Sequence, residues 1–294
     1  MENLLNLRTL SFRGIGLKYL KSLSFQTAPE GGFQRVFDEL SQVYAKEDPW
    51  GLNLAHAERT LRTVYPLYKN YFKVRLFGQE HVEDRPYIVT GNHTGQIAID
   101  GMLISTAFAA EIKPARILRA MVERFFVSLP FVGAWAAEGG AVLGDRQNCL
   151  HLLKQKQSVL VFPEGVKGIA KNTSDHYKLQ PFTRGFFRIS LASGVPILPV
   201  VVIGAEEFFP FVYHPMKLAK MMGLPALPLS LNYLPLPSPV DIHILPAFIP
   251  PQELTPESPD KQIDESIEIL EKMMEEQIAK GLEMRRPFLL NHRS

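Results

Sequence analysis

The chain has 294 residues, with 32 Lys and Arg against 30 Asp and Glu, and 46% of its residues are hydrophobic. This composition is typical of a globular protein and excludes a mostly disordered chain, while a net charge of +2 gives no support for a nucleic-acid partner. The single cysteine, Cys149, cannot form an internal disulfide, which excludes a disulfide scaffold and fits a reducing compartment.

The first 72 residues are predicted to be a helical segment. Residues 1–23 scatter four cations among apolar residues, so they lack the apolar region of a secretory signal. A basic amphipathic stretch of this kind could contact a membrane, or it could dock on the protein's own core. Helical spacing of apolar residues then predicts helices over 34–45 and 54–71, with Pro66 kinking or ending the second.

After residue 72 the pattern changes to short apolar runs that alternate with helices. Several runs are continuously apolar, as in strands that are covered on both faces. This predicts an α/β fold, a mostly parallel sheet flanked by helices, with the core over 73–252 and a C-terminal helix within 253–294. The expected strands are residues 87–89, 117–120, 141–143, 159–162, 197–203 and 242–245, and the expected helices are 97–110, 149–156, 184–192 and 263–280.

No stretch of the sequence is predicted to span a membrane. The longest uncharged run, residues 221–240, contains five prolines, and the apolar run 125–137 is too short. Any membrane role must therefore be peripheral. The apolar loop over 216–236 could border a lipid entrance, or it could pack over the core.

The segment Gly91-Asn92-His93-Thr94-Gly95 follows a predicted strand and precedes a predicted helix that contains Asp100. Ligands bind at the carboxyl ends of strands in α/β sheets, so His93 lies where chemistry is expected. A neutral imidazole can take a proton from a hydroxyl, and a carboxylate can orient it. The alternative is a structural histidine beside a solvated aspartate.

Two later segments place charged residues at the same predicted edge of the sheet. Arg146 follows the predicted strand 141–143, and the fork of an arginine suits phosphate. Glu164, Gly165 and Lys167 follow the strand 159–162 in one short turn. The alternatives are a surface salt bridge for Arg146 and an ordinary Pro-Glu-Gly turn for the second segment. The histidines and the cysteine show no metal-ligand spacing, so no metal is expected.

These segments, with Val195-Pro196-Ile197-Leu198-Pro199 after them, resemble the four motif blocks of the PlsC-like glycerolipid and lysophospholipid acyltransferases. That family carries an Asn-His…Asp block, a Gly…Arg block, a Phe-Pro-Glu-Gly block and a Val-Pro-x-x-Pro block in the same order. Each match alone is a weak hypothesis, and four in order over about a hundred residues make a specific one.

The resemblance implies transfer of a fatty acyl group from acyl-CoA or acyl-carrier protein to a glycerolipid hydroxyl, such as that of lysophosphatidate or another lysophospholipid. His93 would be the general base and Asp100 would orient it. Arg146, Glu164, Gly165 and Lys167 would bind substrate, with backbone N–H groups near Gly165 stabilising an oxyanion. No metal or bound cofactor is implied. We expect a peripheral enzyme on the cytoplasmic face of a membrane.

Two departures from the family pattern keep other acceptors open. Six residues separate His93 from Asp100, where the family has four, and the third block ends in Val166-Lys167 rather than Thr-Arg. A lysine offers a point charge instead of a fork, so phosphate should bind there less well. This leaves room for a neutral acceptor such as diacylglycerol. A non-catalytic lipid-binding protein of the same fold and a thioesterase-like hydrolase remain the alternatives.

Overall fold

The computed structural model describes residues 25–44, 48–94, 98–127, 131–215, 217, 221, 229–232 and 234–285. The basic amphipathic stretch over 1–23 and most of the loop over 216–236 lie outside these residues. The two expectations attached to them therefore stay predictions.

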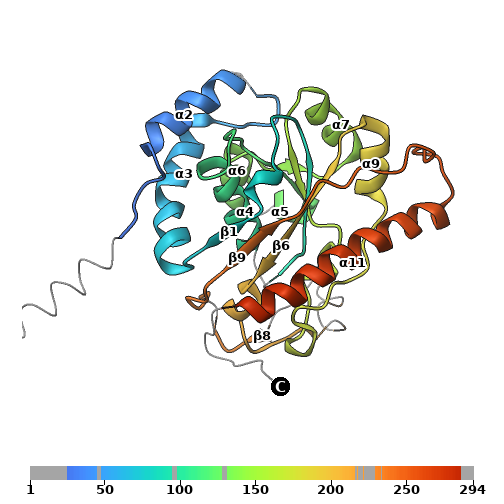
Figure 1. The fold of residues 1–294 in the computed structure, drawn as a ribbon. Helices are drawn as coiled ribbons and strands as arrows, with labels where there is room; N and C mark the ends of the chain where they lie inside the picture. Colours follow the sequence, from blue (N-terminus) through green and yellow to red (C-terminus); the bar gives the residue numbers. More distant parts are fainter. Residues whose placement is uncertain are drawn as a thin grey trace, which may run out of the picture.

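A seven-stranded sheet forms the centre of the fold, in the order β1-β9-β6-β2-β5-β3-β4 (Figure 1). Five neighbouring strands, from β6 to β4, are parallel, whereas β9 is antiparallel to β6 and pairs in parallel with β1. The prediction of a mostly parallel sheet flanked by helices is confirmed. The strands are β1 (Arg75–Phe77), β2 (Ile88–Gly91), β3 (Arg119–Val122), β4 (Val142–Leu143), β5 (Val159–Val161), β6 (Ile197–Ile203) and β9 (Asp241–Ile244).

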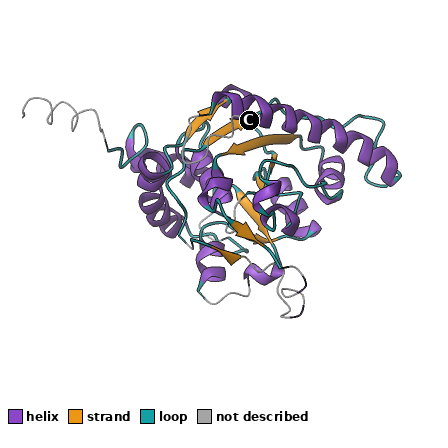
Figure 2. Ribbon diagram, turned by 90° about the horizontal axis from the view of Figure 1, so that it is seen from below, coloured by secondary structure: helices purple, strands orange, loops and turns teal. Residues whose placement is uncertain are grey.

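Helices cover both faces of the sheet, as Figure 2 shows. One face packs against α2 (Gly32–Val43), α3 (Leu54–Pro66) and α4 (Ile99–Ala110), and the other against α7 (Arg146–Lys154), α9 (Gly185–Ser193) and α11 (Asp260–Met284). Because successive strand residues point to opposite faces, β6 sends alternate apolar side chains into the two cores. Every residue of β6 is buried, which explains its unbroken apolar sequence.

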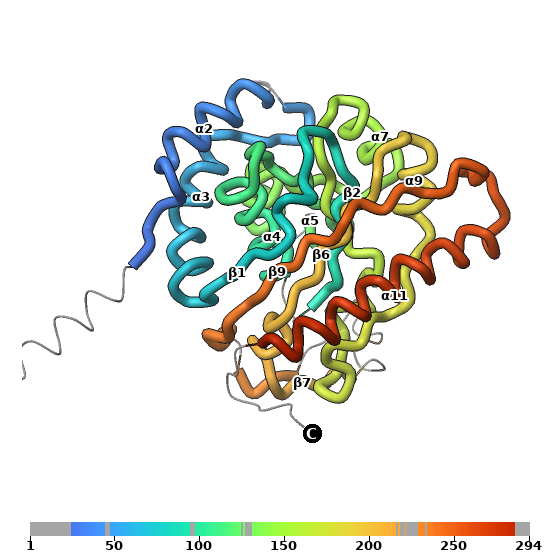
Figure 3. Tube along the Cα trace, in the orientation of Figure 1, coloured from blue at the N-terminus to red at the C-terminus, as the bar shows by residue number. Residues whose placement is uncertain are grey.

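Several shorter elements connect the strands and helices of the main sheet. A two-stranded hairpin lies apart from the main sheet, and the long helix α11 runs beside β6 (Figure 3). Within the described ranges, no helix combines the length and the apolar character needed to cross a membrane. The short elements are α5 (Arg124–Val127), α6 (Val132–Glu138), α8 (Val166–Ile169), β7 (Val212–Tyr213), β8 (Leu229–Ser230) and the helical turns at Gln79–His81, Thr173–Asp175 and Ala205–Phe208.

The expected elements are found with shifted ends, and the strands β1, β7 and β8 were not predicted. The predicted kink at Pro66 is a change of helix type, because α3 ends there and a π-helical turn follows over Leu67–Tyr71. Strand β1 has three residues and no apolar run, so no pattern in the sequence indicates it. Its pairing with β9 is supported by an ion pair in which Arg75 donates from Nε and Nη2 to Asp241, both at 2.6 Å.

Candidate active site

His93 and Asp100 meet at the carboxyl end of the central strand β2. The Nδ1 atom of His93 lies 2.7 Å from Oδ2 of Asp100, and both residues are buried. They do not share a helical face: His93 lies in the loop after β2, and Asp100 is the second residue of α4. The two side chains meet although six residues separate them in the sequence. With Nδ1 bonded to the carboxylate, Nε2 is the ring nitrogen left to take a proton.

Asp100 is held in place by backbone donors. Its Oδ2 also accepts the N–H of Thr94 at 2.8 Å, and its Oδ1 accepts the N–H of Gly101 at 2.7 Å. The carboxylate lies in the first turn of α4, where the helix dipole favours a negative charge. This fully buried side chain is therefore satisfied on both oxygens and can fix the tautomer of His93.

Phe162 sets the orientation of the imidazole ring from its other face. The two rings are stacked with centroids 4.1 Å apart and planes 15° from parallel. Glycines make room for the phenyl ring, since a Cβ on Gly91 would lie 2.8 Å from it and one on Gly101 would lie 3.3 Å from it. The glycine that ends β2 and the one that follows Asp100 thus have a packing role.

Glu164 clasps the backbone of His93 rather than facing open space. Its Oε1 accepts the N–H of His93 at 2.8 Å, and its Oε2 accepts the N–H of Gln180 at 2.8 Å and pairs with the ammonium of Lys171 at 3.0 Å. Lys171 in turn donates to the carbonyl of His93 at 3.2 Å. Both oxygens of Glu164 are engaged by the protein, so in this arrangement Glu164 positions the base. Lys171 belongs to no motif, and sequence reasoning missed it.

The ammonium of Lys171 is shared with a second buried carboxylate, Glu206, at 3.6 Å. Burial raises the pKa of Glu206 to about 7, and the positive charge of Lys171 opposes that rise. The ordinary pKa of this side chain is 4.5, so Glu206 changes its protonation within the range in which enzymes operate. Lys171 therefore links a titrating group, Glu206, to the backbone of His93.

Helix α8 packs its small residue against the base. Gly168 leaves so little space that a Cβ there would lie 2.6 Å from Cβ of His93 and 3.0 Å from Cβ of Glu164. Gly165, which precedes α8, has φ +58 and lines the cavity described below. Its own N–H donates to the carbonyl of Phe162 at 3.0 Å, so an oxyanion contact would have to come from neighbouring N–H groups, and that expectation stays a prediction.

The two cations predicted to bind substrate are placed differently. Arg146 is the exposed first residue of α7, after the edge strand β4, and Lys167 is exposed on α8. Neither is among the described residues that line the cavity at His93. The structure thus brings together His93, Asp100, Glu164 and Gly165, and leaves Arg146 and Lys167 on the surface.

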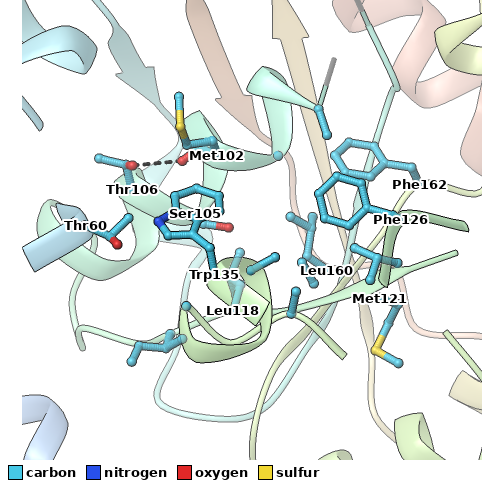
Figure 4. A pocket seen from close by; sticks show the side chains of 18 of the residues that line it. Thr60, Met102, Ser105, Thr106, Leu118, Met121, Phe126, Trp135, Leu160 and Phe162 are labelled. Atoms are coloured by element: carbon cyan, nitrogen blue, oxygen red, sulfur yellow. Dashed lines mark hydrogen bonds between the residues drawn. The ribbon is translucent and has the colours of Figure 1, made fainter. Parts of the chain in front are cut away.

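A largely apolar cavity of about 560 Å³ extends from His93 between the sheet and the helices α2, α3, α4 and α6. This volume is typical of small-molecule sites. Its lining includes Phe37 of α2 and Leu61 and Val64 of α3. In Figure 4 the α4 side chains Met102, Ser105 and Thr106 lie on one side of the cavity, with Trp135 beside Ser105, and Met121, Phe126, Leu160 and Phe162 lie on the other side.

A second imidazole borders the same cavity. His214, which follows β7, is 4% exposed, and neither of its ring nitrogens has a hydrogen-bond partner among the described residues. Burial lowers its pKa from the ordinary 6.5. No motif marked this residue, because its position depends on a hairpin that the sequence did not predict.

Comparisons with known proteins bear on this site. Residues 73–203 match the family model described as Acyltransferase, and this stretch contains His93, Asp100 and Glu164. An uncharacterised protein of Mycobacterium tuberculosis is 34% identical over 182 residues, which are 61% of this chain and 51% of that protein. The 1-acyl-sn-glycerol-3-phosphate acyltransferase of Saccharomyces cerevisiae is 29% identical over 140 residues, 44% of this chain and 42% of that enzyme.

The chain spans about half the length of the curated relatives it matches. Among solved structures, the crystal structure of PlsC, the 1-acyl-sn-glycerophosphate acyltransferase from Thermotoga maritima, is similar with a TM-score of 0.48 at 18% identity. The match covers 90% of this chain and 89% of that one.

Proposed function

Because residues 73–203 match the Acyltransferase family model, we propose that this protein transfers a fatty acyl group from a thioester donor, acyl-CoA or acyl-carrier protein, to a hydroxyl of a glycerolipid. One observation carries the proposal. The imidazole of an Asp100-bound His93 borders an apolar cavity of about 560 Å³. The relatives named 1-acyl-sn-glycerol-3-phosphate acyltransferases make lysophosphatidate and other lysophospholipids the first acceptors to test.

The geometry supports a direct transfer without an acyl-enzyme. The acceptor hydroxyl gives its proton to Nε2 of His93 while its oxygen attacks the thioester carbonyl. The imidazolium is stabilised by Asp100 at 2.7 Å. Collapse of the tetrahedral intermediate breaks the carbon–sulfur bond, and the imidazolium returns its proton to the leaving thiolate. The acyl chain would lie along the apolar wall, where burial of each methylene contributes about 0.8 kcal/mol.

In this mechanism Glu164 is a positioning residue and not a substrate ligand. Its bond to the N–H of His93 and its pair with Lys171 hold the loop that carries the base. Arg146 and Lys167 are exposed and lie outside the cavity lining that the structure describes. If they bind substrate, they contact a part of it that lies at the protein surface.

We also propose that the enzyme works as a peripheral protein on the cytoplasmic face of a membrane. Contact with a lipid surface is supported by the exposed apolar side chains of the β7–β8 hairpin, where Leu231 is 83% exposed and Tyr213 is 61% exposed. Residues 208–240 contain two lysines and no acidic residue, which suits an anionic leaflet. Sedimentation with anionic vesicles tests this, and Leu231→Ser with Tyr213→Ser should weaken it.

The test of the reaction is acyl transfer from labelled acyl-CoA and acyl-carrier protein to a panel of lysophosphatidate, other lysophospholipids, monoacylglycerol and diacylglycerol. His93→Ala is the test variant, and His151→Ala, on the exposed side of α7, is the matched control. A product that requires an acceptor, vanishes in His93→Ala and persists in His151→Ala supports the proposal. Thioester loss to water without an acceptor would indicate a hydrolase. Folded protein that binds lipid and gives no product would indicate a lipid-binding protein.

A further inference from the structure

His214 has the features of a ligand-binding side chain that the catalytic pair leaves unused. Its side chain is 4% exposed and borders the cavity. Both ring nitrogens lack a hydrogen-bond partner among the residues that the structure describes. A buried polar group without a hydrogen bond costs free energy, so such groups are normally paired with protein, water or ligand. A ligand in the cavity would supply the missing partner.

His214 lies at the same end of the cavity as the base. Two adjacent residues tie the pair together: Lys171 donates to the carbonyl of His93 at 3.2 Å, and Asn172 accepts the backbone N–H of His214 at 2.9 Å through its side-chain oxygen. Val166 and Ile169 of α8, whose Gly168 packs on His93, line the cavity beside them. A ligand whose reacting group contacts His93 would therefore also lie near His214.

The charge at this end disfavours a phosphate. The described residues that line the cavity include no lysine or arginine, and they include one acidic residue, Glu123. The imidazole of His214 is itself uncharged at neutral pH, because burial lowers its pKa from 6.5. A buried anion needs a paired cation or several charge-assisted donors. The available donors and acceptors instead suit a hydroxyl or an ester carbonyl.

We propose that His214 hydrogen-bonds an uncharged oxygen of the acceptor, and that the enzyme acylates a neutral lipid of the mono- or diacylglycerol class. This inference rests on the proposed acyl transfer and names its substrate class. His214 would accept from a free hydroxyl or donate to an ester carbonyl, and the same contact would turn the reacting hydroxyl toward Nε2 of His93. A phosphorylated acceptor would meet no cation among the described lining residues.

The first test measures binding without an acyl donor, so it does not depend on turnover. Trp135 lines the cavity and its fluorescence reports occupancy. The ligands are mono-oleoylglycerol and oleoyl-lysophosphatidate, and the variants are His214→Ala, His214→Gln and, as a control histidine at the far edge of the sheet, His81→Ala. We expect tighter binding of mono-oleoylglycerol. His214→Ala should weaken it about five- to tenfold, as expected for one lost hydrogen bond, while His214→Gln should retain most of it.

The second test measures kcat/KM for both acceptors with oleoyl-CoA. His214→Ala should lower kcat/KM for mono-oleoylglycerol by about the same five- to tenfold and leave the KM for the donor unchanged. Equal or tighter binding of lysophosphatidate, or wild-type affinity in both His214 variants, would overturn the inference. The binding preference without transfer to any acceptor would refute the proposed reaction and leave the site assignment standing. Transfer that prefers lysophosphatidate would support the proposed reaction and overturn the assignment of a neutral acceptor.

Discussion

The contact between Gly168 and the base gives a direct test of how tightly the imidazole must be placed. In Gly168→Ala the new Cβ would lie 2.6 Å from Cβ of His93 and 3.0 Å from Cβ of Glu164. Ordinary contact between carbon atoms is about 3.5–4.0 Å, so the backbone near His93 must move by about 1 Å. Both neighbours are Cβ atoms, which cannot swing away as the tip of a flexible side chain can. A shift of this size in a catalytic group costs about 10²-fold in kcat.

The assay is kcat for acyl transfer, with thermal unfolding of the same samples. Overpacking should cost about 1–3 kcal/mol, which leaves a domain of ordinary stability folded. The matched control is Gly185→Ala at the first position of α9, where an added Cβ meets nothing within 4 Å. It should keep full activity and gain slightly in stability. Wild-type kcat in Gly168→Ala would refute the reasoning that α8 fixes His93.

Three further variants test the network around the base. Asp100→Asn should lower kcat by about 10²–10⁴-fold with little change in the melting temperature, because the amide cannot stabilise the imidazolium of His93; a loss below tenfold would contradict the orienting role. Lys171→Met leaves two carboxylates buried without their cation and should destabilise the fold by about 3–5 kcal/mol, measured by urea unfolding, and adding Glu206→Gln should restore part of that loss. Glu206→Gln alone tests the pKa of about 7. Glu206 keeps its proton up to a pH of about 7 in the folded state, whereas in the unfolded chain it loses the proton near pH 4.5. The free energy of unfolding of wild type should therefore fall by up to about 3 kcal/mol as the pH rises from 4.5 to 7, and that of the variant should not. Parallel stability curves for the two proteins across pH 4.5–7 would rule this out.

The order of the elements was predictable because strands and helices differ in apolar period. β6 is a run of seven residues that are all buried, and such a run has few alternatives beside flanking turns. β1 was not predictable, because three residues that include an arginine carry no period. It forms through its pairing with β9 and the ion pair of Arg75 with Asp241, 166 positions away.

In the candidate site, too, residues marked by a local sequence pattern were predictable, and residues placed by contacts distant in the sequence were not. His93 was predictable from its place after a strand, whereas its contact with Asp100 forms without the shared helical face that the spacing suggested. Glu164 was expected to face substrate, and its engagement with the backbone of His93 depends on contacts 71 positions apart. Lys171 and His214 carry no motif, since each acts through a fold contact and not through a local pattern.

The pairing of β1 with β9 has a consequence for synthesis on the ribosome. The one neighbour to which β1 is hydrogen-bonded in the sheet begins at Asp241, after the other five strands. At about 5–20 residues per second, β1 emerges roughly ten to thirty seconds before its partner. During that interval its edge and the apolar faces of α2 and α3 are without part of their final cover. Nascent chains stalled before residue 241 should therefore bind chaperones and be cut by protease near β1, and chains stalled well beyond it should resist.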